Sequence, residues 1–281
     1  MMTRAPAGPL SVVEPWDLVS EGYAAEVGWI MRPISLEALR RVAEAEPRAL
    51  SKDAAVLDVA AGPGTLTIEA SHRVREVHAI DFSEAMLSEL SREVQRLGIR
   101  NVHAVQGDGM ALPYPDERFD AAFSMFGLMF FPDRARGFSE LFRVLRRGGL
   151  ALASSWAPLD QSPLMDLMFG ALRAAEPAMP PPARNLLSLE NPDLFEEELR
   201  AAGFADVSVT PHEHFVTVDS ADVFWSSMTR SAAPCLLLRK KWGETEWAER
   251  SERSLAFLRE RFSGGPLRLS TVAFLGFGRK Q

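Results

Sequence analysis

The stretch of sequence that most constrains the fold is residues 54–67, which read AAVLDVAAGPGTLT. A short apolar run, Ala55–Leu57, ends at Asp58, and small residues including Gly62 and Gly64 follow before a helical pattern begins. This order is typical of a buried parallel strand, a tight turn and a helix N-terminus. Glycines let a ligand lie against the backbone, and the first N–H groups of a helix point at it. The turn is therefore predicted to hold a nucleotide-like cofactor.

Two classes of cofactor compete for this turn. A dinucleotide fingerprint requires G-x-G-x-x-G, and here Gly62 and Gly64 fit the first two positions while Thr67 occupies the third. A better match is an acid followed by small residues at alternate positions, which Asp58 and Ala60 begin and the two glycines continue. Alone, this pattern also fits an ordinary α/β turn, so the strands that follow must decide.

Two further acids lie at the predicted ends of the next two strands. Asp81 follows the second glycine of the turn by 17 residues, close to the spacing at which an acid meets the ribose of a bound nucleotide. Asp108, between Gly107 and Gly109, is suited to accept the exocyclic amine of adenine. The alternatives are a helix cap for Asp81 and an Asp-Gly turn for Asp108. Because the carboxyl ends of parallel strands share one edge, the three acids indicate one ligand site.

Six motifs in order resemble the class I S-adenosylmethionine (SAM)-dependent methyltransferases. Their text is similar to the small-molecule branch typified by ubiquinone and menaquinone biosynthesis methyltransferases. The resemblance covers roughly residues 50–156, is thin elsewhere, and departs mildly at Ala60, where the family usually has its first glycine. The motifs are DVAAGPG at 58–64, AIDFSEAML at 79–87, GDGMALPY at 107–114, RFDAAFS at 118–124, FGLMFFPD at 126–133 and LRRGGLAL at 145–152.

This resemblance implies both the fold and the cofactor. The expected fold class is α/β: a Rossmann-like, doubly wound, mostly parallel seven-stranded sheet with an antiparallel terminal strand and added helices forming a cap. The implied cofactor is SAM, with S-adenosylhomocysteine as product. Its expected contacts are Tyr23, Asp58, Ala60, Gly62, Gly64, Asp81, Phe82, Met86, Gly107, Asp108, Gly109, Met110, Ser124 and Met125.

Beyond the motifs, the chain is expected to supply a lid and a cap. Residues 1–49 are predicted to form a helical lid, although its helices could simply cover one face of the sheet. Residues 50–281 are predicted to form the SAM-binding domain, with helical insertions at 157–190 and 219–262; the first contains a stiff connection that includes Pro180–Pro182. The predicted helices are 15–28, 34–46, 65–73, 83–97, 134–145, 165–175, 191–203 and much of 219–262; the predicted strands are 55–58, 75–80, 101–106, 119–124, 150–155, 205–218 and 269–278.

The methyl acceptor is expected to be a small apolar or aromatic molecule, because the added helices are rich in Trp, Phe and Met. Which of carbon, oxygen and nitrogen is methylated stays open. His212 and His214 are weak candidates for a general base, since a strand histidine is more often a packing or surface residue, and no catalytic residue is assigned. Expected substrate contacts are Trp16, Trp29, Phe130, Trp156, Trp225 and Met228.

Two other functions share these features. An NAD-dependent oxidoreductase has a similar fold, but the third glycine of its fingerprint is replaced here. A non-catalytic SAM-binding scaffold or sensor would keep the glycine turn and lose a usable acceptor pocket. Residues 219–262 could instead form a homodimer surface.

Composition excludes several classes of protein. The 281 residues include one cysteine, Cys235, which rules out an intramolecular disulfide, and no His or Cys spacing indicates a metal site. The net charge of −7 argues against a nucleic-acid partner. No apolar run approaches about 18 residues, and the N-terminus lacks the pattern of a signal peptide. A cytoplasmic protein without a membrane span is the expectation.

Overall fold

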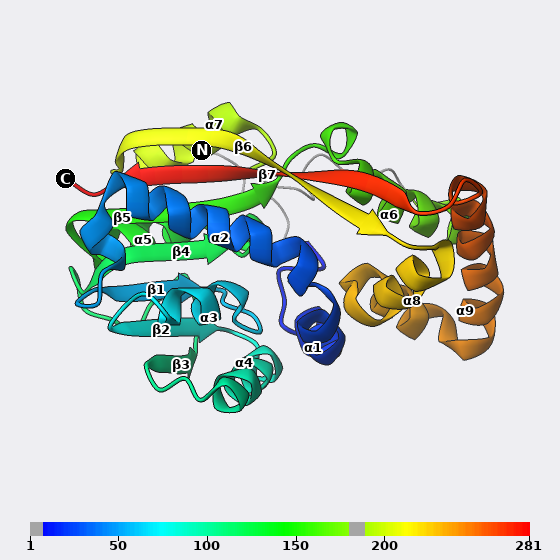
Figure 1. Ribbon diagram of the computed structural model, residues 1–281, viewed down its shortest axis with the longest axis horizontal. Coiled ribbons are helices and arrows are strands. Elements are labelled where there is room, and N and C mark those ends of the chain that lie inside the picture. Colours follow the sequence, from blue (N-terminus) through cyan, green and yellow to red (C-terminus); the bar gives the residue numbers. More distant parts are fainter. Residues whose placement is uncertain (1–7, 180–188) are drawn as a thin grey trace.

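The structure is a computed structural model that describes residues 8–179 and 189–281 (Figure 1). Pro180–Pro182, in the predicted stiff connection, lie outside the described residues. No helix in the described part of the chain combines the length and apolar character needed to cross a bilayer.

Within the described residues, seven strands form a single sheet, and β7 runs antiparallel to both of its neighbours. All other neighbouring strands pair in parallel. The predicted α/β fold class is therefore confirmed, including the antiparallel strand near one edge. In spatial order the strands are β3 (Val102–Gln106), β2 (Glu76–Asp81), β1 (Ala55–Val59), β4 (Phe119–Met125), β5 (Leu145–Trp156), β7 (Leu267–Arg279) and β6 (Ala205–Val218).

Helices cover both faces of the sheet, which explains why its central strands are apolar rather than alternating. All five residues of β1 are buried. Val56 packs into a cluster with α2 and α3, whereas Ala55 and Leu57 pack into a cluster with α5 and α7. The covering elements are α2 (Gly28–Ala45), α3 (Thr65–Ser71), α4 (Glu84–Leu97) and the 3-10 turn η1 (Pro47–Leu50) on one face, and α5 (Arg134–Val144) and α7 (Pro192–Ala201) on the other.

Local signals set several helix ends as predicted. The Ser83 hydroxyl accepts a hydrogen bond from the Met86 N–H and caps α4. Gly98 ends the same helix in the left-handed conformation, with φ 66°. The Asn191 side chain accepts from two N–H groups at the start of α7. These ends are decided by residues a few positions apart, so the sequence is sufficient to find them.

Two predicted boundaries are wrong. Helix α2 begins at Gly28 and runs through Pro33, instead of starting after it. Pro33 is the sixth residue of the helix, so its missing N–H leaves only one carbonyl without a helical partner. Strand β5 begins at Leu145 instead of residue 150, because Leu145 already pairs with Phe119 of β4. The register shifts between this pair and the next, and the shifted stretch contains Gly148 and Gly149.

Strands β6 and β7 extend beyond the rest of the sheet and carry a helical cap (Figure 1). The cap has its own core, in which the rings of Trp225 and Trp247 stack with centroids 5.9 Å apart. Helix α1 lies between this cap and α4 (Figure 1). The cap helices are α6 (Pro163–Ala175), α8 (Ala221–Ser231) and α9 (Ala233–Arg261), α1 spans Glu14–Glu26, and the 3-10 turns η2 (Leu128–Phe130) and η3 (Leu159–Gln161) follow β4 and β5.

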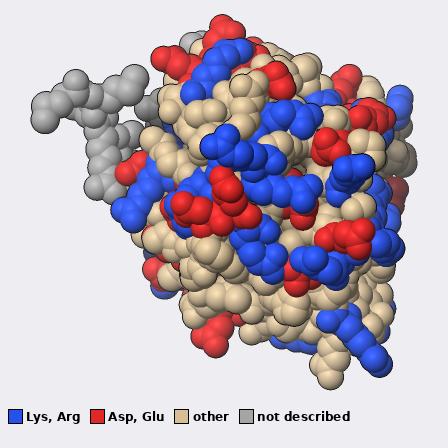
Figure 2. All heavy atoms as spheres, turned by 90° about the vertical axis from the view of Figure 1, so that its left-hand side faces the viewer, with Lys and Arg blue, Asp and Glu red and all other residues tan. Residues whose placement is uncertain are grey.

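The opposite side of the molecule, at the amino ends of the parallel strands, has a mixed surface. Figure 2 shows Lys and Arg side chains beside Asp and Glu side chains across this face. Ion pairs such as Arg118–Glu76 and Arg146–Asp120 join the two signs there. The visible face therefore carries no extended surface of one charge sign.

A close backbone contact attaches α1 to the cap and can be tested. A Cβ added at Gly22 would overlap the carbonyl oxygen of Arg230 in α8. We expect Gly22→Ala to undock α1, which should lower the melting temperature and speed proteolysis between residues 8 and 27. Gly28→Ala is the matched control, since a Cβ there meets nothing within 4 Å. Equal protection from proteolysis in both variants would contradict this docking.

Candidate functional site

A cavity of about 770 Å³ opens at the carboxyl edge of the sheet, within the size range of small-molecule sites. Its walls come from the ends of β1, β2 and β4, the loop after β3, the helices α1 and α2, and the cap helices α6, α8 and α9. The sheet side carries carboxylates and glycines, whereas the cap side is almost entirely apolar. The cavity therefore has two chemically different halves.

The glycine turn after β1 has three residues in the left-handed conformation: Ala60 (φ 56°), Gly62 (φ 54°) and Gly64 (φ 87°). Gly62 lines the cavity, and a Cβ built on it would meet no atom within 4 Å. A Cβ on Gly64 would overlap Leu90 of α4, and Gly64 lies outside the cavity lining. Gly64 is thus required for helix packing rather than for ligand contact, contrary to the expectation.

The alanine at position 60 is accommodated by a glycine elsewhere in the chain. A Cβ on Gly127, just after β4, would overlap both the Ala60 methyl group and the Ser124 hydroxyl. The methyl group at position 60 therefore occupies space that residue 127 leaves free. Ser124 itself is fully buried beneath the cavity and does not line it.

Asp81 joins the end of β2 to the glycine turn. One carboxylate oxygen accepts from the Gly62 N–H at 2.8 Å, and the other accepts from the Ser83 N–H at 2.9 Å. The Ser83 hydroxyl in turn donates to the Asp17 carboxylate of α1 at 2.6 Å. Burial raises the pKa of Asp81 above its ordinary value, against the opposing effect of these backbone hydrogen bonds. No local signal marks Asp17, because its partner is 66 residues away.

Asp58 lies at the base of the same half of the cavity. Its carboxylate accepts a hydrogen bond from the Thr67 hydroxyl at 2.6 Å and is 1 % exposed. Burial raises the pKa of Asp58 to about 7, and the nearby charge of Asp81 adds to that shift. A cation bound beside Asp58 would favour its ionised form.

Asp108 lies at the outer rim of this half. It is exposed, lines the cavity, and accepts a hydrogen bond from the Met110 N–H at 2.8 Å. The glycines on either side serve packing, since a Cβ on Gly107 would crowd Ile80 and one on Gly109 would crowd Phe131. Asp108 thus faces the cavity, as a ligand contact requires, and its carboxylate also holds the turn, as the alternative predicted.

The structure brings most of the expected residues together. Every expected cofactor contact except Gly64 and Ser124 lines the cavity. Five of the six expected substrate contacts also line it: Trp16, Trp29, Phe130, Trp156 and Met228. The expectation for Trp225 is wrong, because its ring is buried against Trp247 inside the cap.

The two candidate base histidines lie elsewhere. His212 and His214 are on β6, the strand at the edge of the sheet, and neither lines the cavity. Partial burial lowers the pKa of His212, with Glu37 of α2 opposing that effect. The structure therefore does not bring either imidazole to the site, and neither is carried into a mechanism.

Helix α1 contributes more of the lining than the sequence indicated. Trp16 packs against Phe130 and Tyr23, with ring centroids 5.2 Å and 6.3 Å away. Burial and the charge of Asp81 raise the pKa of Tyr23 well above its ordinary range, so its hydroxyl stays protonated. Glu26, at the end of α1, also lines the cavity and forms an ion pair with Arg230 of α8.

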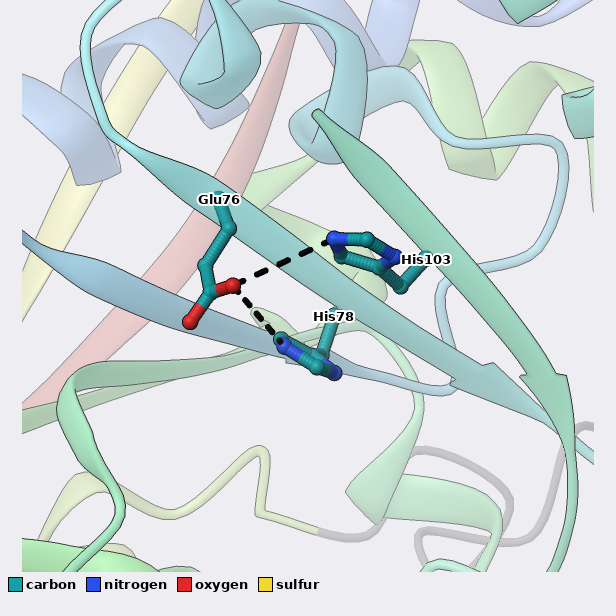
Figure 3. A group of neighbouring side chains, drawn as sticks. All are labelled: Glu76, His78 and His103. Carbon is teal, nitrogen blue, oxygen red and sulfur yellow. Dashed lines mark ion pairs between the residues drawn. The ribbon is translucent and has the colours of Figure 1, made fainter. Parts of the chain in front are cut away.

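A second cluster of polar side chains lies at the opposite end of the sheet (Figure 3). A carboxylate oxygen of Glu76 is 3.8 Å from His78 Nε2 and 3.9 Å from His103 Nε2. The Arg118 guanidinium pairs with Glu76 and approaches His78 Nε2 at 3.4 Å, and this pairing is the main reason that the pKa of Glu76 falls to about 2. Arg118 thus already supplies the cation for this cluster, and we assign it no metal.

Comparison with known proteins places this geometry in context. Residues 56–149 match a family described as a methyltransferase domain. The chain is 31% identical over 185 residues to a demethylmenaquinone methyltransferase of Geobacillus stearothermophilus, an alignment that covers 58% of this chain and 76% of the relative. It is 38% identical over 121 residues to a demethylmenaquinone methyltransferase of Deinococcus radiodurans, covering 42% of this chain and 49% of that relative.

Solved structures share the fold at lower identity. The [4+2]-cyclase SpnF superposes with a TM-score of 0.61 at 19% identity, covering 99% of each chain. A phosphoethanolamine N-methyltransferase 2 of Haemonchus contortus, in complex with S-adenosyl-L-methionine, gives a TM-score of 0.53 at 17% identity, covering 89% of this chain and 53% of that one. At these identities the likeness extends to the fold alone.

The buried carboxyl of Asp58 makes a prediction about stability. Because its pKa is raised in the folded protein, folding loses stability as pH rises from about 4 to about 7. We expect Asp58→Asn, which keeps an acceptor for Thr67, to raise the free energy of unfolding at pH 8 by roughly 1–3 kcal/mol. At pH 4.5 the gain should be much smaller. Denaturant unfolding of both proteins at the two pH values measures it, and an equal change at both would show that ionisation is not the cause.

Proposed function

The chain belongs to the family of SAM-dependent methyltransferases, and from this premise we propose that its cavity binds SAM on the sheet side and a small apolar or aromatic acceptor on the cap side. The protein transfers the methyl group of SAM to a small molecule. The single observation that carries the site assignment is the pairing of a carboxylate-lined glycine turn with an apolar chamber in one cavity.

The sheet side fits SAM in shape and in charge. Above Gly62 the backbone is open to the cavity, so a ligand can lie against it. The Asp81 carboxylate accepts two backbone hydrogen bonds and retains lone pairs for the ribose hydroxyls. Asp58 and Asp81 place negative charge beside a ligand that bears a sulfonium and an ammonium group. We propose that Phe82 and Met86 contact the adenine and that Asp108 accepts its amine.

The cap side fits an apolar acceptor. Three separate elements line the cavity here: α2 with Trp29, η2 with Phe130 and α8 with Met228. The rings of Phe126 and Trp156 stack with centroids 4.1 Å apart and form a rigid wall. Such a chamber excludes water and holds the acceptor by shape.

When bound, SAM supplies a methyl group that its sulfonium has already activated. The chain then has to hold the acceptor atom in line with that methyl group, at a reacting distance of about 3–3.5 Å. The glycine turn and Asp81 fix the cofactor side, while the walls of the chamber orient the acceptor. We propose residues 1–49 as the lid, because α1 contacts α4 through Asp17 and the cap through Arg230.

The other two functions lack support. At the third position of the dinucleotide fingerprint, the Thr67 hydroxyl donates to Asp58, and this contact requires a side chain that glycine does not have. A non-catalytic scaffold would not need the large apolar chamber that the cap adds. Residues 219–262 supply chamber walls through Met228, Leu237 and Leu238, which supports an acceptor role over a dimer surface.

Replacing Asp81 tests the cofactor site. We expect Asp81→Ala to weaken SAM binding by roughly 1.5–3 kcal/mol, the scale of losing hydrogen bonds to a charged group. Isothermal titration with SAM, S-adenosylhomocysteine and NAD measures this, and wild-type protein should bind the first two and not NAD. Asp116→Ala, an exposed loop residue far from the cavity lining, is the control. A folded Asp81→Ala protein with unchanged SAM affinity would refute the ribose assignment.

Replacing Gly62 tests whether the turn is the cofactor cradle. Gly62→Val projects a side chain into the cavity and should abolish SAM binding. The control, Gly148→Val, is placed at a left-handed residue (φ 79°) with open space around its Cβ and no contact with the cavity. Both variants carry the same backbone strain, so a comparable loss of stability is expected. Only the change at Gly62 should remove the heat of SAM binding.

A further inference from the structure

Methionine side chains are concentrated around the cavity. The chain has 11 methionines, and eight of them line this cavity: Met31, Met86, Met110, Met125, Met165, Met168, Met179 and Met228. Among the other methionines, Met129 alone lies within the described residues, and it is buried in the core beneath the sheet edge. Six leucines line the same cavity, although leucine is far more common in the chain. Apolar character alone does not explain this distribution.

The cavity methionines fall into two groups by position. Met86, Met110 and Met125 lie on the sheet side, near the proposed cofactor site. The other five come from the elements that face it across the cavity: Met31 from α2, Met165 and Met168 from α6, Met179 from the segment after α6, and Met228 from α8. Each of the elements α2, α6 and α8 therefore contributes at least one methionine to the walls of the proposed acceptor chamber.

Methionine gives a wall different properties from leucine. Its side chain is unbranched, has three rotatable bonds, and ends in a polarizable thioether that makes favourable contacts with aromatic rings. Met165 and Met168 are half-buried, whereas Met228 is buried at 5 % exposure. Such a wall can change shape around different ligands, as methionine-rich surfaces of promiscuous binding proteins do.

The stacked pair Phe126 and Trp156 contrasts with the unbranched methionine side chains. Both rings are buried, at 7 % exposure each, and their contact fixes one side of the chamber next to the end of β4 and β5. A flat acceptor ring can therefore rest on this aromatic surface, while Met168 and Met228, which belong to the core of the cap, line the same cavity from other elements. This arrangement favours aromatic ligands without selecting one shape.

We propose that the acceptor chamber is adaptable, so that the enzyme accepts aromatic molecules of several shapes, and that Met165, Met168 and Met228 determine this breadth. The proposal rests on the proposed function of the cavity, because it assigns the cap side to the acceptor. It goes further in restricting the acceptor to aromatic molecules, in proposing that several shapes are accepted, and in naming the residues that control specificity.

The test compares wild-type protein with the triple variant Met165→Leu, Met168→Leu and Met228→Leu. Leucine has nearly the same volume, and Leu–Met exchanges cost less than about 1.5 kcal/mol each, so the variant should fold. The probes are 1-naphthol, 2-naphthol, 2-phenylphenol and 4-phenylphenol, which share a hydroxyl and differ in shape. Their dissociation constants are measured on the full chain, saturated with S-adenosylhomocysteine, by displacement of the fluorescent probe N-phenyl-1-naphthylamine.

For wild-type protein, the four dissociation constants should lie within about tenfold of one another, since the wall adjusts. In the triple variant the probe that binds most tightly should keep its affinity. The ratio of the largest to the smallest of the four dissociation constants should increase at least tenfold. Met129→Leu makes the same chemical change outside the cavity lining, and its spread should match wild type. Melting temperatures confirm that all three proteins are folded.

The proposal is overturned if wild-type protein binds only one of the four shapes, or if the triple variant keeps the wild-type spread of dissociation constants. Titration with SAM separates failure of this proposal from failure of the proposed function. If wild-type protein does not bind SAM, the cofactor site is refuted. If it binds SAM but only one probe shape, only the adaptable wall is refuted. If the probes do not displace the dye at all, the cap side is not an aromatic site.

Discussion

The carboxylate of Asp81 is the interaction on which the site depends. It accepts hydrogen bonds from the Gly62 N–H and the Ser83 N–H, and so ties the glycine turn, the end of β2 and the start of α4 together. The Ser83 hydroxyl extends this link to Asp17 of α1. Three segments that are distant in sequence, in α1, in the glycine turn and at the junction of β2 with α4, therefore meet around one buried acid that lines the cavity.

The charge of that edge has a cost in the free protein. Burial opposes the ionisation of both Asp58 and Asp81, and a neighbouring charge adds to each effect: that of Asp81 raises the pKa of Asp58, and that of Asp17 raises the pKa of Asp81. A positively charged ligand would reduce this repulsion. Its binding would therefore stabilise the folded protein. This is the usual conflict between stability and function at a binding site, in which groups arranged for a ligand are unfavourable without it.

The apolar side of the cavity is lined largely by the cap helices. Strands β6 and β7 extend past their neighbours, and the helices that they carry form a cap with its own apolar core. Helix α1 joins the two halves, because Asp17 reaches α4 and Glu26 pairs with Arg230 of α8. Helix α1 is thus tied both to the junction that carries Asp81 and to the cap.

The sequence by itself determined the parts of the protein that depend on neighbouring residues. The cap residues Ser83 and Asn191 were predictable because each acts within a few positions of its partner. The glycine turn and the acids after β1, β2 and β3 were predictable because they directly follow apolar strand patterns, whose carboxyl ends share one edge of the sheet. Only the tertiary structure decided which residues face the cavity. Trp225 and Gly64 were expected there and instead pack on Trp247 and Leu90, while Asp17 gained a partner 66 residues away. Such contacts depend on how separate elements are docked, and no local pattern encodes that.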